Sequence, residues 1–111
     1  MQNPIVFNIT IKIEKTLSKD WLTKMQNDYL PPCIDGQIIT GTQINFIHLN
    51  EQDDDDTFAV QFTFANGEKF EHYKLTSMQK FLNLLDQDYR GKYVYFTTKM
   101  ERVFSSSLIN K

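Results

Sequence analysis

Cysteine, glycine and proline are scarce in this chain of 111 residues. The single cysteine, Cys33, excludes an intramolecular disulfide and any metal site built from several cysteines. Four glycines and three prolines beside 14% aromatic residues exclude a disordered or low-complexity chain. No apolar run approaches the roughly 20 residues of a membrane span, and the start of the chain alternates instead of forming a signal-peptide block. We therefore expect a cytoplasmic protein.

A strong excess of charge of one sign is missing as well. The chain has 12 basic and 14 acidic side chains, which give a formal net charge of -2. That balance removes the long-range attraction that nucleic acid or an anionic membrane needs, so we expect neither as a partner. A mass of 13.1 kDa is enough to bury about two-thirds of the unfolded surface. We predict one domain over residues 1–104 and a C-terminal tail over 105–111.

Alternation of apolar and polar residues predicts four strands, at about Ile5–Glu14, Gln37–Leu49, Thr57–Ala65 and Lys92–Val103. The first and third strands each have one strongly apolar face. The second has apolar groups on both faces near its end, so its facing stays open. On the fourth strand, one face carries Val94, Phe96, Thr98 and Met100, and the other carries Tyr93, Tyr95, Thr97 and Lys99. The acidic run Glu51–Asp56 is predicted as a loop.

Spacings of three and four residues predict two helices between these strands. The first is expected to begin with Ser18 as its N-cap and to end before Pro31. The second is expected to be capped by Asn66 and to extend to about Asp88, with a break near Thr76 left open. The expected buried stripes are Trp21, Leu22, Met25 and Tyr29 on the first helix, and Leu75, Met78, Leu82, Leu85 and Tyr89 on the second.

The order strand–helix–strand–strand–helix–strand predicts a ferredoxin-like sandwich of the α+β class. Right-handed crossovers place the first and third strands in the centre of a four-stranded antiparallel sheet, with strand order 4-1-3-2 and both helices on one face. These two strands have the strongest apolar faces, so order and pattern agree. The expected core contains Ile9, Ile11, Trp21, Met25, Phe58, Val60, Phe62, Leu82, Leu85 and Phe96.

The other face of the predicted sheet has no helix to cover it. Its expected residues are Asn8, Thr10, Gln61, Thr63, Tyr93, Tyr95 and Thr97, with Lys12 and Lys99 toward the ends. A solvated face would carry more lysine and glutamate. The composition therefore favours a face that packs against another sheet or encloses a wet cavity. The alternative is a solvated sheet whose polar residues are simply suited to strands.

Three segments carry a resemblance to a known family. They are Trp21-Leu22 with Met25 and Tyr29-Leu30-Pro31, then Phe62-Thr63, and finally Lys92-Tyr93-Val94-Tyr95-Phe96-Thr97-Thr98. Over about Ile9–Val103 the chain resembles an uncharacterised bacterial family, domain of unknown function 4286. The resemblance implies a small dimeric α+β barrel built on a ferredoxin-like protomer, and hence a homodimer. It implies no activity, and the histidine of the family's His-Ile-Pro run is replaced here by Tyr29.

In the wider dimeric α+β-barrel group, haem-degrading and quinol-oxidising members use Asn, His and Trp around the cavity. Here Asn8 is expected on the open face, Trp21 lies on a buried stripe, and His72 is either a ligand contact or a surface residue. The alternative function is a small-molecule oxygenase or isomerase that uses Asn8, Tyr93, Tyr95 and His72. Because the open face has few titratable groups, the leading interpretation is a non-enzymatic or uncharacterised homodimer whose two open faces pack together. Whether an unidentified small molecule lies in a cavity between them stays open.

Other candidate sites are weaker. His48 precedes the acidic run, but consecutive carboxylates without a turn glycine do not preorder an ion, so a solvated hairpin tip is favoured. Cys33 has no activating neighbour in the sequence and is expected to be structural. The exposed positions of the first and third strands carry no aromatic residue on which RNA bases could stack. We predict no metal and no cofactor.

Overall fold

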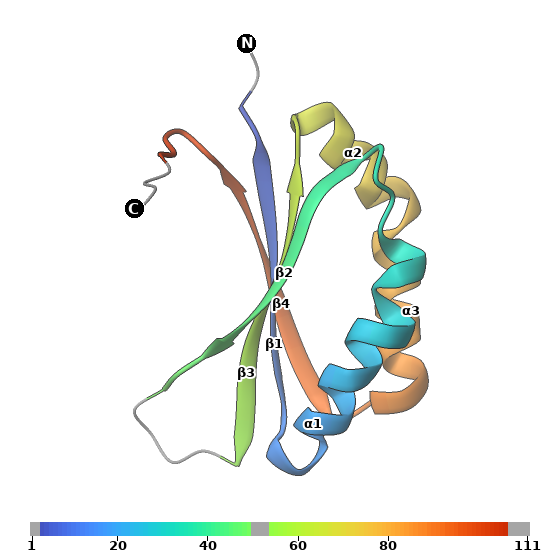
Figure 1. Ribbon diagram of the computed structural model, residues 1–111. Coiled ribbons are helices and arrows are strands. Elements are labelled where there is room, and N and C mark those ends of the chain that lie inside the picture. Colours follow the sequence, from blue (N-terminus) through green and yellow to red (C-terminus); the bar gives the residue numbers. More distant parts are fainter. Residues whose placement is uncertain (1–2, 50–53, 107–111) are drawn as a thin grey trace, which may run out of the picture.

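The computed structural model describes residues 3–49 and 54–106, which form one sheet with a layer of helices on one side (Figure 1). The elements in chain order are β1 (Ile5–Glu14), α1 (Lys15–Lys24), the π-helical turn η1 (Met25–Tyr29), the 3-10 turn η2 (Pro31–Cys33), β2 (Ile39–Ile47), β3 (Asp55–Phe64), α2 (Gly67–Thr76), α3 (Met78–Tyr89) and β4 (Tyr93–Glu101). The predicted α+β class and ferredoxin-like architecture are confirmed. In the described part of the chain, no helix is long and apolar enough to cross a membrane.

The strands pair in the order β2-β3-β1-β4, which is the predicted order read from the other edge. Side chains of residues directly opposite on antiparallel strands share a face. The pairs Ile9–Val60 and Phe7–Phe62 therefore direct their side chains to the same side, and all four residues are at most 4% exposed. The core of the molecule lies between this side of the sheet and the helices.

The register also settles the facing of β2. Ile44 lies opposite Val60 and Phe46 lies opposite Phe58, so both point toward the helices. A bulge follows Ile39, which stays buried. Phe46 is nevertheless 47% exposed, because β2 is an edge strand that the helices cover only in part.

The first helix starts earlier than predicted. It begins at Lys15, directly after β1, and Ser18 is a helical residue and not its N-cap. Ser18 is buried, and its hydroxyl donates a hydrogen bond to Asp56 Oδ2 at 2.6 Å. Asp55 and Asp56, predicted as part of the acidic loop, are the first residues of β3. The rest of that run lies outside the described residues, apart from the exposed Asp54.

The second helical segment is broken where the sequence left the question open. Asn66 caps α2, since its side chain accepts a backbone N–H of the first turn at 2.9 Å, as predicted. Residues 76–79 have the sequence of a capping box, but no such box forms, because the Thr76 hydroxyl donates to the carbonyl of His72 at 2.8 Å. The chain turns at Ser77 before α3 begins, so the two helices do not share one stripe. Leu75, predicted to be buried, is therefore 85% exposed.

The facing of β4 is the reverse of the prediction. Tyr95 lies opposite Ile11 and Thr97 opposite Ile9, so Tyr93, Tyr95 and Thr97 are on the helical side. Phe96 points the other way, is 63% exposed and does not belong to the core. The prediction assumed that the more aliphatic face packs inward. On this edge strand the helical side is covered only in part, and tyrosine suits such a border because it pairs an apolar ring with a polar tip.

Candidate functional site

The candidate site is the face of the sheet opposite the helices, which is uncovered in Figure 1. We call it the open face and define it by the residues that the register places there. Apart from the charged residues at one end, they are Val6, Asn8 and Thr10 of β1, Gln43, Asn45 and Ile47 of β2, Thr57, Ala59, Gln61 and Thr63 of β3, and Val94, Phe96, Thr98 and Met100 of β4. Among the described strand residues, charges at equivalent positions are confined to one end, at Lys12, Glu14 and Asp55. Four predicted site residues, Asn8, Thr10, Gln61 and Thr63, thus lie together.

Asn8 is the most buried polar residue of this face, with 8% of its surface exposed. Its amide nitrogen donates to Thr10 Oγ1 at 2.8 Å. Its Oδ1 atom is buried, and no donor from the described residues reaches it. An unsatisfied buried acceptor costs about 1–3 kcal/mol. The centre of the open face therefore contains a side-chain carbonyl oxygen that is buried and lacks a hydrogen-bond donor among the described residues.

The neighbouring polar groups on β2 and β3 are neutral. The Gln43 side-chain nitrogen donates to Gln61 Oε1 at 3.1 Å across the two strands. Next to this pair, Thr63 lies opposite Gly41, which has no side chain, so space remains around the threonine. These residues give this half of the face hydrogen-bonding groups without charge.

The β4 edge of the open face is apolar instead. Val94 is 65% exposed, Phe96 63% and Met100 38%. We call these three residues the apolar stripe. Sequence reasoning missed the stripe because it assigned Phe96 to the core. The signal that could have revealed it is the position of Lys99 and Glu101 on the opposite face of the same strand, which suits a half-covered border better than a core.

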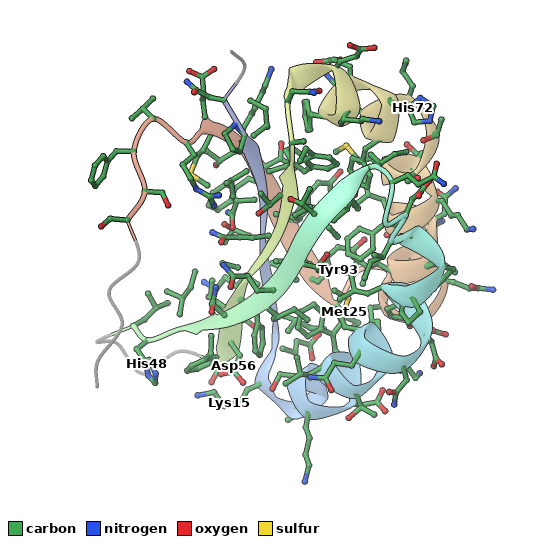
Figure 2. All side chains as sticks on the ribbon, turned by 45° about the horizontal axis from the view of Figure 1, so that its top comes forward. Lys15, Met25, His48, Asp56, His72 and Tyr93 are labelled. Atoms are coloured by element: carbon green, nitrogen blue, oxygen red, sulfur yellow. The ribbon has the colours of Figure 1, made fainter. Side chains whose placement is uncertain are left out.

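Tyr93, Tyr95 and Thr97 do not line the open face. Figure 2 shows Tyr93 between the sheet and the helices, where its hydroxyl donates to Asp86 Oδ1 of α3 at 2.6 Å. Burial and this hydrogen bond raise the pKa of Tyr93 above its ordinary value. Lys99 is also on the helical side, with its ammonium 5.1 Å from the centre of the Phe70 ring. These positions leave the open face without the predicted tyrosines.

Two further tyrosines form hydrogen bonds that tie the helices together. Tyr29 of η1 donates to Asp88 of α3, and Tyr89 of α3 donates to Asp20 Oδ2 of α1, the latter at 2.6 Å. Burial, and then these hydrogen bonds, raise the pKa of both tyrosines, whereas the bond from Tyr89 lowers the pKa of Asp20. Lys24 lies 3.6 Å from Asp20 and 3.9 Å from Asp88. This cluster is in the helical layer and so has a structural role.

His72 and Trp21 are both remote from the open face. Figure 2 shows His72 on the outer side of α2, where it is exposed and lines a groove of about 470 Å³ with acidic residues such as Glu68 and Glu71. Trp21 is fully buried, with its ring centre 4.8 Å from that of Phe58. Of the Asn, His and Trp residues considered from the sequence, only Asn8 is on the open face. The described residues therefore do not assemble that set around one cavity.

The remaining candidates stay apart from one another. His48 is exposed and contacts the edge of Phe46, with ring centres 4.9 Å apart. Cys33 is a free cysteine, 2% exposed, and burial raises the pKa of its thiol. In residues 3–49 and 54–106, no three His, Cys, Asp or Glu side chains are grouped in a way that could hold a metal ion.

A four-stranded antiparallel sheet in the order β2-β3-β1-β4, with helices on one face, defines a protein of the ferredoxin-like α+β class. The model of the family domain of unknown function 4286 matches residues 4–103. The chain belongs to this family. No curated protein matches its sequence.

Solved structures with the same fold are distant in sequence. A conserved protein of unknown function from Bacteroides thetaiotaomicron, described as a possible oxidoreductase, has a TM-score of 0.63 at 10% identity, over 92% of this chain and 100% of that chain. A putative antibiotic biosynthesis monooxygenase from Bacillus cereus has a TM-score of 0.65 at 9% identity, over 97% and 98%. A dimeric ferredoxin-like protein from an uncultured marine organism has a TM-score of 0.54 at 9% identity, over 93% and 99%. At these identities the likeness shows the fold alone.

Proposed function

We propose that the chain is a non-enzymatic homodimeric domain whose two open faces pack against each other around a small-molecule cavity. The observation that carries this proposal is the apolar stripe, because Phe96 and Val94 are each more than 60% exposed on a face without charge at its centre. Exposed apolar groups gathered on one face mark an interaction surface. A second copy of the same face would cover them.

Two further observations support the same reading. The Asn8 side chain lies on this face with its Oδ1 atom unpaired, and a covering partner or an enclosed ligand would supply the missing donor once the amide turns outward. One of the solved structures with this fold is described as dimeric. A homodimer uses an isologous interface, in which each patch meets its own copy.

A non-catalytic role fits the composition of the face better than catalysis does. General acid–base or nucleophilic chemistry needs titratable groups that converge on one point. In the described residues, Lys12, Glu14 and Asp55 lie at the far end of the open face, away from Asn8. Neutral amides and hydroxyls at the centre instead suit the binding of a neutral polar molecule.

Association through the open face is tested by adding a charge to it. Thr63→Lys and Phe96→Lys each place two cations in a two-fold interface, where their desolvation opposes association. Neither side chain packs in the core, and Gly41 leaves room beside Thr63, so both variants are expected to fold. Gln26→Lys adds the same charge on the exposed helical layer and serves as the control.

Sedimentation velocity provides the measurement. The parent and Gln26→Lys are expected to sediment at twice the chain mass of 13.1 kDa, and both open-face variants as monomers. Folded variants that remain dimeric would place the interface elsewhere. A parent that is monomeric at micromolar concentration would refute the proposal.

The cavity is tested by melting curves with haem, quinones and small metabolites. A compound that binds the folded state raises the melting temperature by mass action. If the cavity forms between two open faces, a stabilising compound should act on the parent and on Gln26→Lys but not on monomeric Thr63→Lys. Equal stabilisation of the monomer would show that the compound binds outside a shared cavity.

A further inference from the structure

The chain beyond β4 exposes two large apolar side chains next to each other. Val103 is 81% exposed and Phe104 is 80% exposed. We call residues 102–106 the C-terminal arm. The next residues, Ser105 and Ser106, are polar and exposed. Two adjacent apolar residues with this much exposed surface are unfavourable in water unless another surface covers them.

The direction of the C-terminal arm keeps it away from its own core. The backbone N–H of Arg102 still donates to the carbonyl of Pro4 at 2.9 Å, which holds the start of the arm beside the start of β1. Beyond this point the arm lies on the side of the sheet opposite the helices in Figure 1 and in Figure 2. It therefore extends from the border of the open face, close in sequence to Met100 of the apolar stripe.

The area of the open face indicates what the arm would add to an interface between two copies. Four strands about 4.8 Å apart and nine residues long, at about 3.3 Å per residue, span a flat area of about 600 Å². Sheet twist separates the corners of two facing sheets, so their contact does not exceed this area. A stable, specific interface buries about 800 Å² per partner. The open face alone would therefore lie at the lower end of the range for specific interfaces, about 600–1,000 Å² per partner.

The two apolar residues of the arm would raise the buried area to about the middle of this range. An aromatic side chain buries about 150–250 Å², so Phe104 and Val103 together offer about 200 Å². The second copy is the occupant that fits, because its open face brings a matching apolar stripe to the same border. Two-fold symmetry makes the contact reciprocal, with each arm reaching the other subunit.

We infer that the C-terminal arm clasps a second copy of the chain, with Val103 and Phe104 packed on the partner's open face. This inference rests on the proposed association through open faces. It assigns Phe104, which lies outside the matched family region at residues 4–103, a direct part in assembly.

The test compares full-length variants by sedimentation equilibrium. The arm variant Val103→Ser/Phe104→Ser removes both apolar groups, and Leu75→Ser removes an equally exposed apolar group on the helical side as the control. Because each dimer contains two arms, the arm variant should raise the dissociation constant of the dimer by about 100-fold or more. The control should leave it unchanged. Neither variant touches the core, so both should unfold like the parent at concentrations where all are monomeric.

The outcomes separate this inference from the proposed function. An arm variant that dimerises as tightly as the parent, while Phe96→Lys is monomeric, would overturn the clasp and leave the open-face dimer standing. Equal weakening by Leu75→Ser would also overturn the clasp, because the effect would not be specific to the arm. A monomeric parent would overturn both.

Discussion

Phe62→Ala is expected to remove a large part of the stability of the fold. Phe62 is fully buried on β3, and the centres of the Tyr73 and Phe81 rings lie 5.4 Å and 6.1 Å from its own. Truncation removes the transfer free energy of the ring and leaves a cavity, at a combined cost of about 3–5 kcal/mol. Domains of this kind have a free energy of unfolding of about 5–15 kcal/mol. The variant should therefore lose at least about a fifth of its free energy of unfolding.

Urea unfolding followed by circular dichroism measures this loss. Several protein concentrations separate subunit association from the stability of the protomer. Leu75→Ala is the matched control, because Leu75 is 85% exposed and its loss should change the free energy of unfolding by less than about 0.5 kcal/mol. A loss below about 1 kcal/mol for Phe62→Ala would show that the apolar face of β3 does not pack against the helices.

Three other perturbations test local features. Asp56→Ala should lower the free energy of unfolding in urea by about 1.5–3 kcal/mol, because it leaves the buried Ser18 hydroxyl without its charged acceptor. Asp54→Ala removes an exposed side chain and should leave the free energy of unfolding unchanged, so equal losses in the two variants would contradict this prediction. Gly91→Ala should cost about 1–2 kcal/mol, because Gly91 has a φ of 78°, and an unchanged midpoint would exclude that strain. Tyrosines with a raised pKa stabilise the fold fully below their ordinary pKa of 10.0, and this contribution is lost as the pH rises above it. They are Tyr29, Tyr73, Tyr89 and Tyr93. The melting temperature should fall above about pH 10, and less so in Tyr89→Phe; identical pH profiles would refute this.

Central strands were predictable from the sequence because burial on one face imposes a strict alternation. In β1, every residue from Ile5 to Ile13 that faces the helices is large and apolar, and all are at most 5% exposed. On β3, Phe58 and Phe64 follow the same alternation and are at most 6% exposed, and the predicted strand began only two residues late. Because a shift of one residue would expose the whole apolar face, the register of a strand that packs on the core can be predicted from its alternation.

Edge strands and helix starts were not predictable in the same way, because a partial cover imposes a weaker pattern. On β4, both faces mix apolar and polar residues, and the deciding contacts are with distant residues such as Asp86, the acceptor of the Tyr93 hydroxyl. Serine is a residue type typical of an N-cap, yet the Ser18 hydroxyl donates to the carboxylate of Asp56, 38 residues further along the chain. Contacts at that separation leave no local signature.

The half of the candidate site that lies on β1 and β3 could be predicted from the sequence. Asn8 and Gln61 follow from the alternation of strands whose other face is core. Phe96 did not, because large apolar residues are normally assigned to the interior, whereas Phe96 is 63% exposed on an edge strand. The unpaired oxygen of Asn8 has no signal in the sequence at all.

The position of the single tryptophan decides what an optical experiment on this protein reports. Trp21 is fully buried on α1 against Phe58, on the side of the sheet away from the open face. Its fluorescence should therefore shift to longer wavelength when α1 leaves the sheet and should not change when subunits separate. Emission at a fixed denaturant concentration thus follows the protomer alone, while light scattering on the same sample follows association. If the proposed dimer forms, the two signals from one cuvette separate the stability of the protomer from the stability of the association.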